Sequence, residues 1–185
     1  MTTDAAIELG EFFDYVWGSP EEWGDKEVWV YLPLKAADGR FEKAFFKWPT
    51  QRRGTINWVL KNAALPVDVF YSPALFTRAN PQKEYVLGAR TLWVDFDGNA
   101  PVDWPADIAP EPTLVIQSSL ETNQHCYWRL DELVTDIELL EDRNRALALA
   151  LKAETSGWDA DQILRPPHTI NRKRNIPTKI VRWDR

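Results

Sequence analysis

The stretch Thr91–Gly98, TLWVDFDG, constrains the fold most, because it places two carboxylates in an otherwise apolar run. Successive side chains of a β-strand alternate between its faces, so Asp95 and Asp97 share one face with Trp93. At about 3.3 Å of rise per residue, the two acids lie roughly 6 to 7 Å apart. Carboxylates held so close repel each other unless water, a shared proton or a cation relieves the repulsion.

A divalent cation is the simplest partner for this pair of acids. Carboxylate oxygens are hard ligands that suit Mg²⁺ or Mn²⁺, and Gly98 ends the strand where a loop can admit a substrate. The alternative is a surface strand whose polar face carries Asp twice. Asp is disfavoured in strands, and the neighbouring residues are apolar, so we favour the metal site.

The composition predicts a folded globular protein in a reducing compartment. The chain has 185 residues, of which 44% are hydrophobic and ten are tryptophan. Its one cysteine, Cys126, excludes an intrachain disulfide, and with two histidines it cannot form a structural zinc site. The first residues lack a signal-peptide pattern, and no apolar run approaches 18 residues, so we expect a cytoplasmic protein without a membrane span.

Charge is distributed unevenly along the chain. The net charge of −6 argues against general affinity for nucleic acid. Residues 165–185, however, contain seven basic residues and one acidic residue, a charge of +6, which leaves −12 for the rest. We predict that part of this segment contacts a nucleic-acid strand, through Arg172, Lys173, Arg174 and Lys179.

A second basic tract has aromatic residues between its cations, a mixture typical of surfaces that bind single strands. A solvated hairpin at a sheet edge explains this tract equally well. The cations are Lys35, Arg40, Lys43, Lys47, Arg52 and Arg53, and the aromatic residues are Phe41, Phe45, Phe46 and Trp48.

Periodicity and turn residues predict an α+β fold. In the first half we expect helices at 3–17 and 55–65, the second capped by Thr55, and strands at 27–35, 40–48 and 67–75. The buried stripe of the first helix is predicted to be Ile7, Phe12, Phe13 and Val16. In the second half we expect the acid-bearing strand, a hairpin of strands 113–117 and 126–130, a helix from the capping box at Thr135 to about Glu154, and a strand at 179–183.

Three groups of residues could then meet over one sheet face. They are the two acids, His125 at the mouth of the hairpin, and Asp159 with the basic loop behind it. Carboxylates hold metal ions, while Arg, Lys and a protonated His can hold phosphate oxygens that the metals leave exposed. This set of groups is suited to a metal-bound triphosphate.

In these motifs the chain resembles the archaeo-eukaryotic primase superfamily, in particular the primase-polymerase domains of phage and plasmid replication proteins. Members have an Asp-x-Asp/Glu on a strand for the metals, a histidine after a Ser-containing turn for the nucleotide phosphates, and a third acid. Here these correspond to Asp95 and Asp97, to Ser118-Ser119 followed by His125, and to Asp159. The resemblance covers about residues 66–175.

A further run in phage-type members, Asp-x-x-Gln-hydrophobic-Leu-Arg-x-Pro-Gly-Thr-x-Asn-x-Lys, resembles residues 159–173. The resemblance implies that Asp95, Asp97 and Asp159 are catalytic metal ligands. It also implies a nucleotide site made of Ser118, Ser119, His125, Arg165, Asn171 and Lys173.

The resemblance further implies an RRM-like antiparallel sheet module, about 89–185, fused to a smaller N-terminal α/β module, about 1–88. The implied activity is that of a DNA primase and DNA polymerase in phage or plasmid replication: template-directed, metal-dependent transfer of a nucleotide from dNTP or NTP to a 3′-hydroxyl. Single-stranded DNA template and primer would be its partners, Mg²⁺ or Mn²⁺ its cofactor, and the cytoplasm of a bacterial host its location.

We expect the chain to be a domain excised from a longer replication protein. Any helicase motor is expected on another chain or after Arg185, because no phosphate-binding loop sequence is present.

Two residues depart from the family pattern. His168 stands where the family has Gly, so the backbone there is expected to adopt a positive φ less freely. Asp161 is a rival to Asp159 for the third metal ligand, and we prefer Asp159 because it matches the position of the motif acid.

Two other functions remain open from the sequence. A haloacid-dehalogenase-type phosphohydrolase has a similar Asp-x-Asp at the end of an apolar strand, with the first Asp as nucleophile. That family requires a doubly wound fold and a later Gly-Asp-x-x-x-Asp, which is missing here. A non-catalytic single-strand binder would use the aromatic residues and the basic tail but leaves the three acids unexplained.

Overall fold

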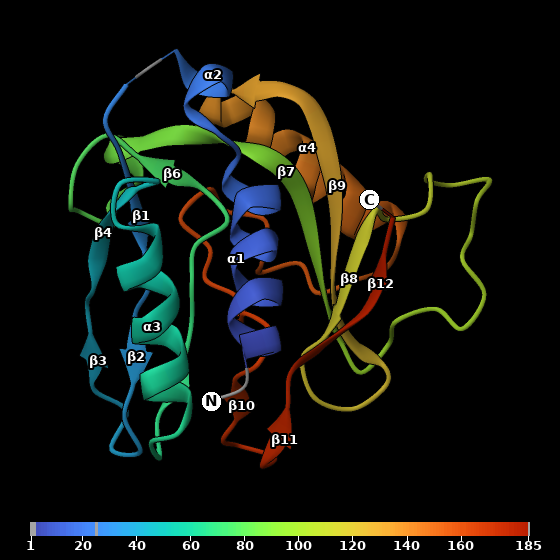
Figure 1. Cartoon of the computed structure of the whole chain (residues 1–185). Coiled ribbons are helices and arrows are strands. Elements are labelled where there is room, and N and C mark those ends of the chain that lie inside the picture. Colours follow the sequence, from blue (N-terminus) through green and yellow to red (C-terminus); the bar gives the residue numbers. More distant parts are fainter. Residues whose placement is uncertain (1–2, 25, 185) are drawn as a thin grey trace.

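A computed structural model of the chain describes residues 3–24 and 26–184. Figure 1 shows a mixed α/β fold with a large antiparallel sheet and few helices. The helices are α1 (Thr3–Trp17), α2 (Pro20–Trp23), α3 (Arg52–Ala63) and α4 (Ile137–Ala150), with a 3-10 turn η1 (Lys83–Tyr85). The strands are β1 (Val28–Tyr31), β2 (Leu34–Lys35), β3 (Phe41–Glu42), β4 (Phe45–Trp48), β5 (Asp68–Val69), β6 (Leu75–Phe76), β7 (Val86–Asp97), β8 (Leu114–Gln117), β9 (Asn123–Val134), β10 (Ile170–Asn171), β11 (Ile176–Pro177) and β12 (Lys179–Trp183).

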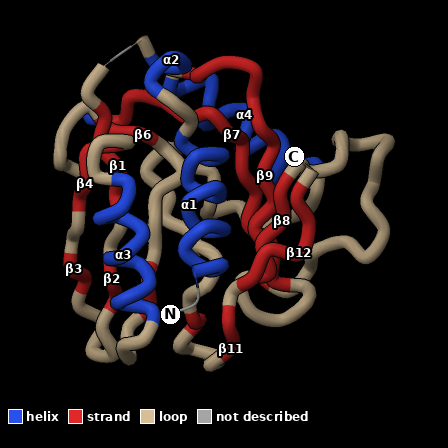
Figure 2. The backbone as a smooth tube through the Cα atoms, in the orientation of Figure 1, coloured by secondary structure: helices blue, strands red, loops and turns tan. Residues whose placement is uncertain are grey.

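One seven-stranded sheet joins the two halves of the chain, in the order β12-β8-β9-β7-β6-β1-β4. Two smaller sheets, β3-β2-β5 and β10-β11, flank it. Every strand pairing that the structure describes is antiparallel. The long, curved strands β7 and β9 run side by side through the middle of the molecule (Figure 2). The expected N-terminal and RRM-like modules therefore contribute strands to the same sheet.

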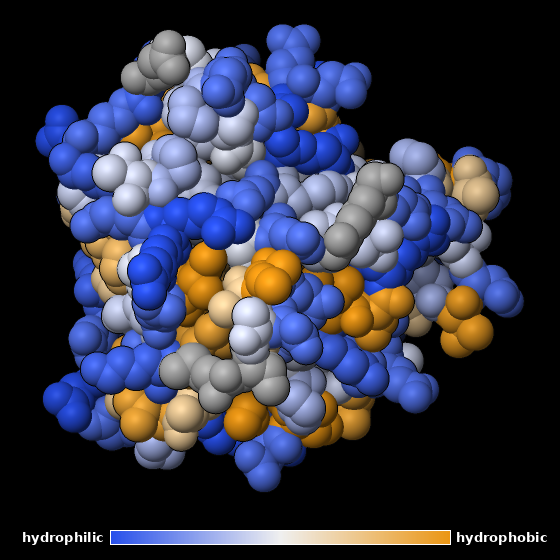
Figure 3. Space-filling view, in the orientation of Figure 1, coloured by the Kyte–Doolittle hydropathy of each residue, from blue (hydrophilic) through white to orange (hydrophobic). Residues whose placement is uncertain are grey.

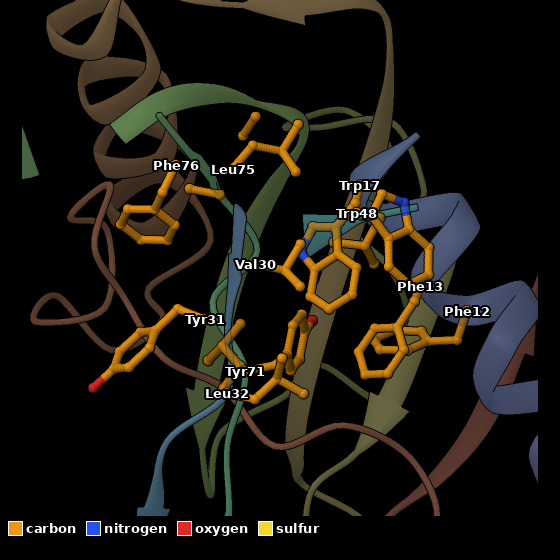
Figure 4. Close-up of a cluster of buried hydrophobic side chains, with 14 of the residues drawn as sticks. Phe12, Phe13, Trp17, Val30, Tyr31, Leu32, Trp48, Tyr71, Leu75 and Phe76 are labelled. Carbon is orange, nitrogen blue, oxygen red and sulfur yellow. The ribbon is translucent and has the colours of Figure 1, made fainter. Parts of the chain in front are cut away.

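The main core lies where α1 packs against the sheet. Leu9, Phe12, Phe13, Val16 and Trp17 recur at helical spacing and are fully buried. Figure 4 shows Phe13, Trp17 and Trp48 grouped on one side of β1, and the rings of Phe13 and Trp17 stack with centroids 4.2 Å apart. The predicted stripe was wrong at Ile7, which is 54% exposed, because Leu9 and Trp17 complete the buried face.

A second core cluster lies between α4 and the other face of β7 and β9. Val94 and Phe96 of β7 pack there with Ala148 of α4 and Trp128 of β9. Asp136 caps α4 by accepting a hydrogen bond from Leu139 N–H. In Figure 1, α1 and α3 lie in front of the sheet and α4 lies behind β7 and β9. The face that carries α1 and α3 is mainly hydrophilic, with separate hydrophobic areas (Figure 3).

Several element boundaries differ from the sequence predictions. Helix α3 begins at Arg52, before Thr55, whose hydroxyl donates to Gln51 O instead of capping the helix. The expected strand 67–75 is two short strands, β5 and β6, on either side of an irregular segment. Strand β9 runs to Val134, well past the predicted end. No helix within the described residues is long and apolar enough to cross a membrane.

Candidate active site

Pairing between β7 and β9 assembles the centre of the candidate site. In the antiparallel register, Asp95 lies opposite His125 and Asp97 lies opposite Asn123. Pairing between β8 and β9 places the Ser118-Ser119 turn next to the same strand ends, because Gln117 lies opposite Gln124. Residues that the sequence separates by about 20 to 30 positions therefore meet at one end of the sheet.

A polar cavity of about 360 Å³ lies at this end of the sheet. Acids occupy the β7 wall, hydroxyl and amide groups come from the turn and from β9, and cations come from the loop around β10. The lining residues are Asp95, Asp97, Ser118, Ser119, Asn123, His125, Glu154, Ser156, Arg165, Asn171, Lys173 and Arg174. The structure thus brings together Asp95, Asp97 and all six residues of the predicted nucleotide site.

The two acids of β7 differ in their surroundings. Burial, together with the negative charge of Asp97, raises the pKa of Asp95 to about 6, and Arg165 opposes this shift. Asp97 is exposed at the strand end and accepts a hydrogen bond from the Asn123 amide. The pair therefore has one carboxylate in the wall of the cavity and one at its opening.

The surroundings of His125 favour its neutral imidazole. The side chain is almost fully buried, and burial together with the charge of Arg165 lowers its pKa to about 3. Its Nε2 lies 3.6 Å from Oδ1 of Asp95. Desolvation and the nearby guanidinium both disfavour the imidazolium, so the direction of this pKa shift runs against a protonated histidine.

Three buried polar atoms around the cavity have no hydrogen-bond partner within the described part of the chain. They are Nδ1 of His125, Oδ1 of Asn123 and Oδ1 of Asn171. Buried polar atoms normally find a partner, so three unpaired atoms around one cavity point to a ligand or water as the missing partner. The Asn171 amide N–H₂ is already used, since it donates to Ser118 O at 3.3 Å.

Arg165 is held in place beside the acids. Its guanidinium pairs with Asp68 at 3.0 Å and lies over the ring of Phe70, 4.6 Å from the centroid. A guanidinium fixed by an ion pair and an aromatic ring is pre-organised to contact an anion at the cavity. Lys173 and Arg174 are exposed at the rim, so they are free to follow a flexible ligand.

The segment after α4 passes close to β7. Glu154 N–H donates to Asp95 O at 3.0 Å, and a Cβ atom at Gly157 would lie 3.5 Å from the Cβ of Asp95. Trp93 Nε1 donates to Gly157 O, and Asn144 of α4 accepts from Trp93 N–H. These bonds fix the segment against the strand that carries the acids.

The third acid at the cavity is Glu154, and Asp159 lies outside the lining. Glu154 also contributes to the raised pKa of Asp95. Asp159 lies instead in the electrostatic surroundings of Asp161, Glu141 and Lys83, where burial and the two acids raise its pKa. The structure therefore does not bring the predicted third ligand to Asp95 and Asp97, and Asp161 is exposed on the same segment.

Sequence reasoning missed Glu154 because the helix was expected to reach it. Helix α4 ends at Ala150, and Lys152 has a positive φ of 55°. The chain then turns back toward β7. Asn123 and Ser156 also line the cavity and were not predicted as site residues. Asn123 could have been predicted, because it lies in the expected turn of the hairpin that carries His125.

The predicted strand-binding cations separate into different positions. Arg172 points to α3, where its guanidinium donates to Ala63 O at 2.7 Å and to Leu65 O, and its N–H donates to Asp68. It therefore caps the end of α3 rather than facing the cavity. Lys179 is exposed on β12, outside the lining, whereas Lys173 and Arg174 reach the cavity rim.

His168 adopts the backbone conformation that glycine would favour. Its φ is 61°, and its Nε2 lies 2.6 Å from Oε2 of Glu8 on α1. The loop therefore adopts the positive φ even with histidine in place of glycine. The contact with Glu8 offers a side-chain interaction that glycine lacks.

The donor set fits a hard divalent cation shared with a substrate. Among the described residues no group of three or more His, Cys, Asp or Glu side chains is placed to hold a metal alone. Mg²⁺ commonly uses one or two carboxylates together with substrate phosphates and water. Asp95 and Asp97 supply those two carboxylates, and the cavity leaves room for the rest.

Comparison with solved structures gives three neighbours. The catalytic domain of primase RepB′, solved in complex with initiator DNA, matches with a TM-score of 0.70 and 18% identity over 98% of this chain and 86% of that chain. The primase-polymerase domain of cyanophage S-2L matches with a TM-score of 0.70 and 9% identity over 94% and 88%. The chain has a primase-polymerase fold.

A second structure of primase RepB′ agrees, with a TM-score of 0.68 and 16% identity over 97% of this chain and 57% of that chain. No protein-family model matches the sequence, and no curated protein matches it. The resemblance that the motifs implied therefore holds at the level of the primase-polymerase fold.

Proposed function

We propose that this domain is a primase-polymerase that transfers nucleotides from dNTP or NTP to a 3′-hydroxyl on a DNA template. The observation that carries the proposal is the grouping of Asp95, Asp97, His125 and Arg165 around one polar cavity. The likeness to a primase bound to initiator DNA and to a phage primase-polymerase supports it.

In this proposal Asp95 and Asp97 would hold Mg²⁺ or Mn²⁺ at the end of β7. The metal, when bound, would neutralise phosphate charge and lower the pKa of the attacking hydroxyl. Asp95 and Asp97 would supply the carboxylate ligands of that cation. Arg165, already fixed by Asp68 and Phe70, provides positive charge for phosphate oxygens.

The polar residues around the acids would hold the triphosphate and sugar. His125 has a buried Nδ1 without a partner among the described residues, and Asn171 has an equivalent Oδ1. Ser118 and Ser119 add hydroxyl groups, and Lys173 adds a charge at the rim. Neutral donors and acceptors of this kind would select the substrate by hydrogen bonding. The metal and the cationic side chains would neutralise most of the negative charge of the triphosphate.

The phosphohydrolase alternative conflicts with the topology. That family has a doubly wound parallel sheet, whereas the strand pairings described in this chain are antiparallel, β7 with β9 and β6 included. A non-catalytic binder remains the main competitor. It does not explain why Asp95 and Asp97 are held together beside three buried polar atoms without partners among the described residues.

Extension of a labelled primer separates synthesis from binding alone. The domain is given a primed single-stranded template, dNTPs or NTPs, and either Mg²⁺ or Mn²⁺. Metal-dependent extension that is lost in Asp95→Asn and Asp97→Asn but kept in Asp161→Asn supports the proposal. Binding of the template without extension under all these conditions would favour the non-catalytic reading.

A further inference from the structure

One face of the N-terminal strands carries a row of aromatic side chains. The pairing register is continuous from Val28 opposite Trp48 to Lys35 opposite Phe41, so β1-β2 and β4-β3 form one long ribbon. Val28 and Val30 are buried, while Trp29 and Tyr31 alternate to the opposite face. Figure 4 shows Tyr31 directed away from the side on which Phe13, Trp17 and Trp48 lie.

Five aromatic residues lie on this face, and ring contacts join four of them in two pairs. Tyr31 stacks on Phe45 with centroids 4.8 Å apart and an interplanar angle of 20°. Phe41 lies 6.3 Å from Phe70 on the neighbouring segment. We call this set the aromatic ribbon face, and its members are Trp29, Tyr31, Phe41, Phe45 and Phe70. Phe41 is 50% exposed, Trp29, Phe45 and Phe70 are partly exposed, and Tyr31 is buried at 7% exposure.

Cations lie among the rings of the aromatic ribbon face. Lys35 Nζ is 5.6 Å from the centroid of Phe41, and Lys47 Nζ is 5.3 Å from that of Trp29. Lys43 is exposed between Phe41 and Phe45 in the sequence. Partly exposed rings alternating with lysines are suited to a ligand that has both flat apolar surfaces and negative charge.

The aromatic ribbon face is continuous with the candidate active site. Phe70 belongs to this face, and the guanidinium of Arg165 covers its ring. Arg165 also lines the polar cavity. A ligand lying on the ribbon would therefore reach the two acids of β7 without crossing α1 or α3, which cover the opposite face (Figure 1).

We propose that the aromatic ribbon face binds the unpaired bases of a single-stranded DNA template and leads that strand into the cavity. This inference rests on the proposed polymerase function and adds the template path to it. Rings stack on bases of any sequence, and the lysines neutralise the phosphates between them. The basic segment 165–185, which the sequence predicted to contact the strand, supports a template path less well than the aromatic ribbon face does. One of its predicted contacts, Arg172, is turned toward α3.

Stacking can be tested without nucleotide or metal. Fluorescence anisotropy in EDTA measures binding of a labelled 20-nucleotide oligo(dT) and of an abasic strand of the same length. Stacking contributes most of the affinity difference between these ligands, so Phe41→Ala should weaken oligo(dT) binding about fivefold or more and leave the abasic strand within about twofold. Phe41→Trp should restore oligo(dT) binding. Leu149→Ala, an exposed apolar residue on α4, is the matched control.

Charge contacts along the same path have an independent test. Each phosphate contact contributes about 0.7 to the slope of log K against log salt on single strands. The double variant Lys35→Gln and Lys43→Gln should therefore reduce the slope by about 1.4, whereas Lys61→Gln on α3 should leave it unchanged. A reduction in the double variant alone supports the template path.

The path is contradicted if Phe41→Ala leaves oligo(dT) binding unchanged, or weakens both strands equally. An unchanged salt slope in the lysine double variant contradicts it as well, and points to a protein partner on this face. Because these measurements contain no nucleotide or metal, they fail independently of primer extension. A domain that binds through Phe41 but extends no primer would leave the strand path in place and remove the polymerase proposal.

Discussion

Asp95 on β7 and His125 on β9 face each other across the strand pair, with Oδ1 and Nε2 3.6 Å apart. The acid belongs to the expected metal site and the histidine to the expected nucleotide site. A shift of one residue in the pairing of β7 with β9 would therefore separate the expected metal site from the expected nucleotide site. The site thus depends on the same hydrogen-bonded ladder that holds the centre of the sheet together.

Replacing His125 is expected to weaken nucleotide binding more than template binding. His125 lines the cavity and its buried Nδ1 has no partner among the described residues, whereas it is not part of the aromatic ribbon face. His125→Ala should lower affinity for a dNTP about tenfold. Filter binding of nucleotide and of oligo(dT), measured separately, gives the comparison. Equal losses for both ligands would show that the histidine mainly supports the hairpin.

Glu154 is expected to matter more for catalysis than Asp159. Glu154 lines the cavity and lies close enough to raise the pKa of Asp95, while Asp159 is surrounded by Lys83, Glu141 and Asp161. Glu154→Gln should slow primer extension about tenfold or more, and Asp159→Asn should change it by less than about threefold. The reverse order of effects would restore Asp159 as the third acid.

Arg172 is expected to stabilise the fold rather than to bind DNA. Its guanidinium donates to two carbonyl groups at the end of α3. Arg172→Ala should lower the free energy of unfolding by about 1–3 kcal/mol and leave the salt dependence of DNA binding unchanged. Arg174→Ala, an exposed neighbour at the cavity rim, is the matched control and should leave stability unchanged. Urea denaturation of both variants measures this difference.

The surroundings of Glu22 are expected to make part of the free energy of unfolding depend on pH. Burial alone would raise its pKa, but the Ser19 N–H and the guanidinium groups of Arg129 and Arg90 outweigh burial and lower it. Its Oε1 lies 2.5 Å from Arg90 and 2.6 Å from Arg129. A lowered pKa in the folded state adds stability above the unfolded value, about 4.3, which is lost as pH falls through the folded pKa.

Glu22→Gln should therefore destabilise the domain by about 2 kcal/mol at pH 7. The difference from wild type should shrink as pH falls below about 4. Thermal unfolding at a series of pH values gives the measurement. A difference that stays constant down to pH 3 would mean that the carboxylate charge is not what stabilises this contact.

Much of the candidate site was predictable from the sequence because it depends on strand periodicity. Alternation along β7 places Asp95 and Asp97 on one face, and the hairpin predicted from its spacing carries His125, which β7–β9 pairing brings beside Asp95. The Ser118-Ser119 turn follows from the same pairing. These positions depend on local rules that a single sequence contains.

The positions of Glu154 and Arg172 could not be predicted from the sequence, because they depend on where the backbone turns and on which elements it packs against. The helix was predicted to reach Glu154, but the positive φ at Lys152 turns the chain earlier and brings Glu154 to the cavity. Arg172 and Arg174 are two residues apart and of the same type. Only tertiary packing against α3 shows that the first is structural and the second faces the cavity.

The most direct test of the account is metal-dependent primer extension by Asp95→Asn and Asp97→Asn, compared with wild type and with the exposed control Asp161→Asn. Loss of a metal ligand removes several kcal/mol of charge stabilisation, so extension should fall at least about 100-fold in the first two variants. Their thermal unfolding should stay within a few degrees of wild type. Extension at the wild-type rate by a folded Asp95→Asn variant would contradict the assignment of the active site.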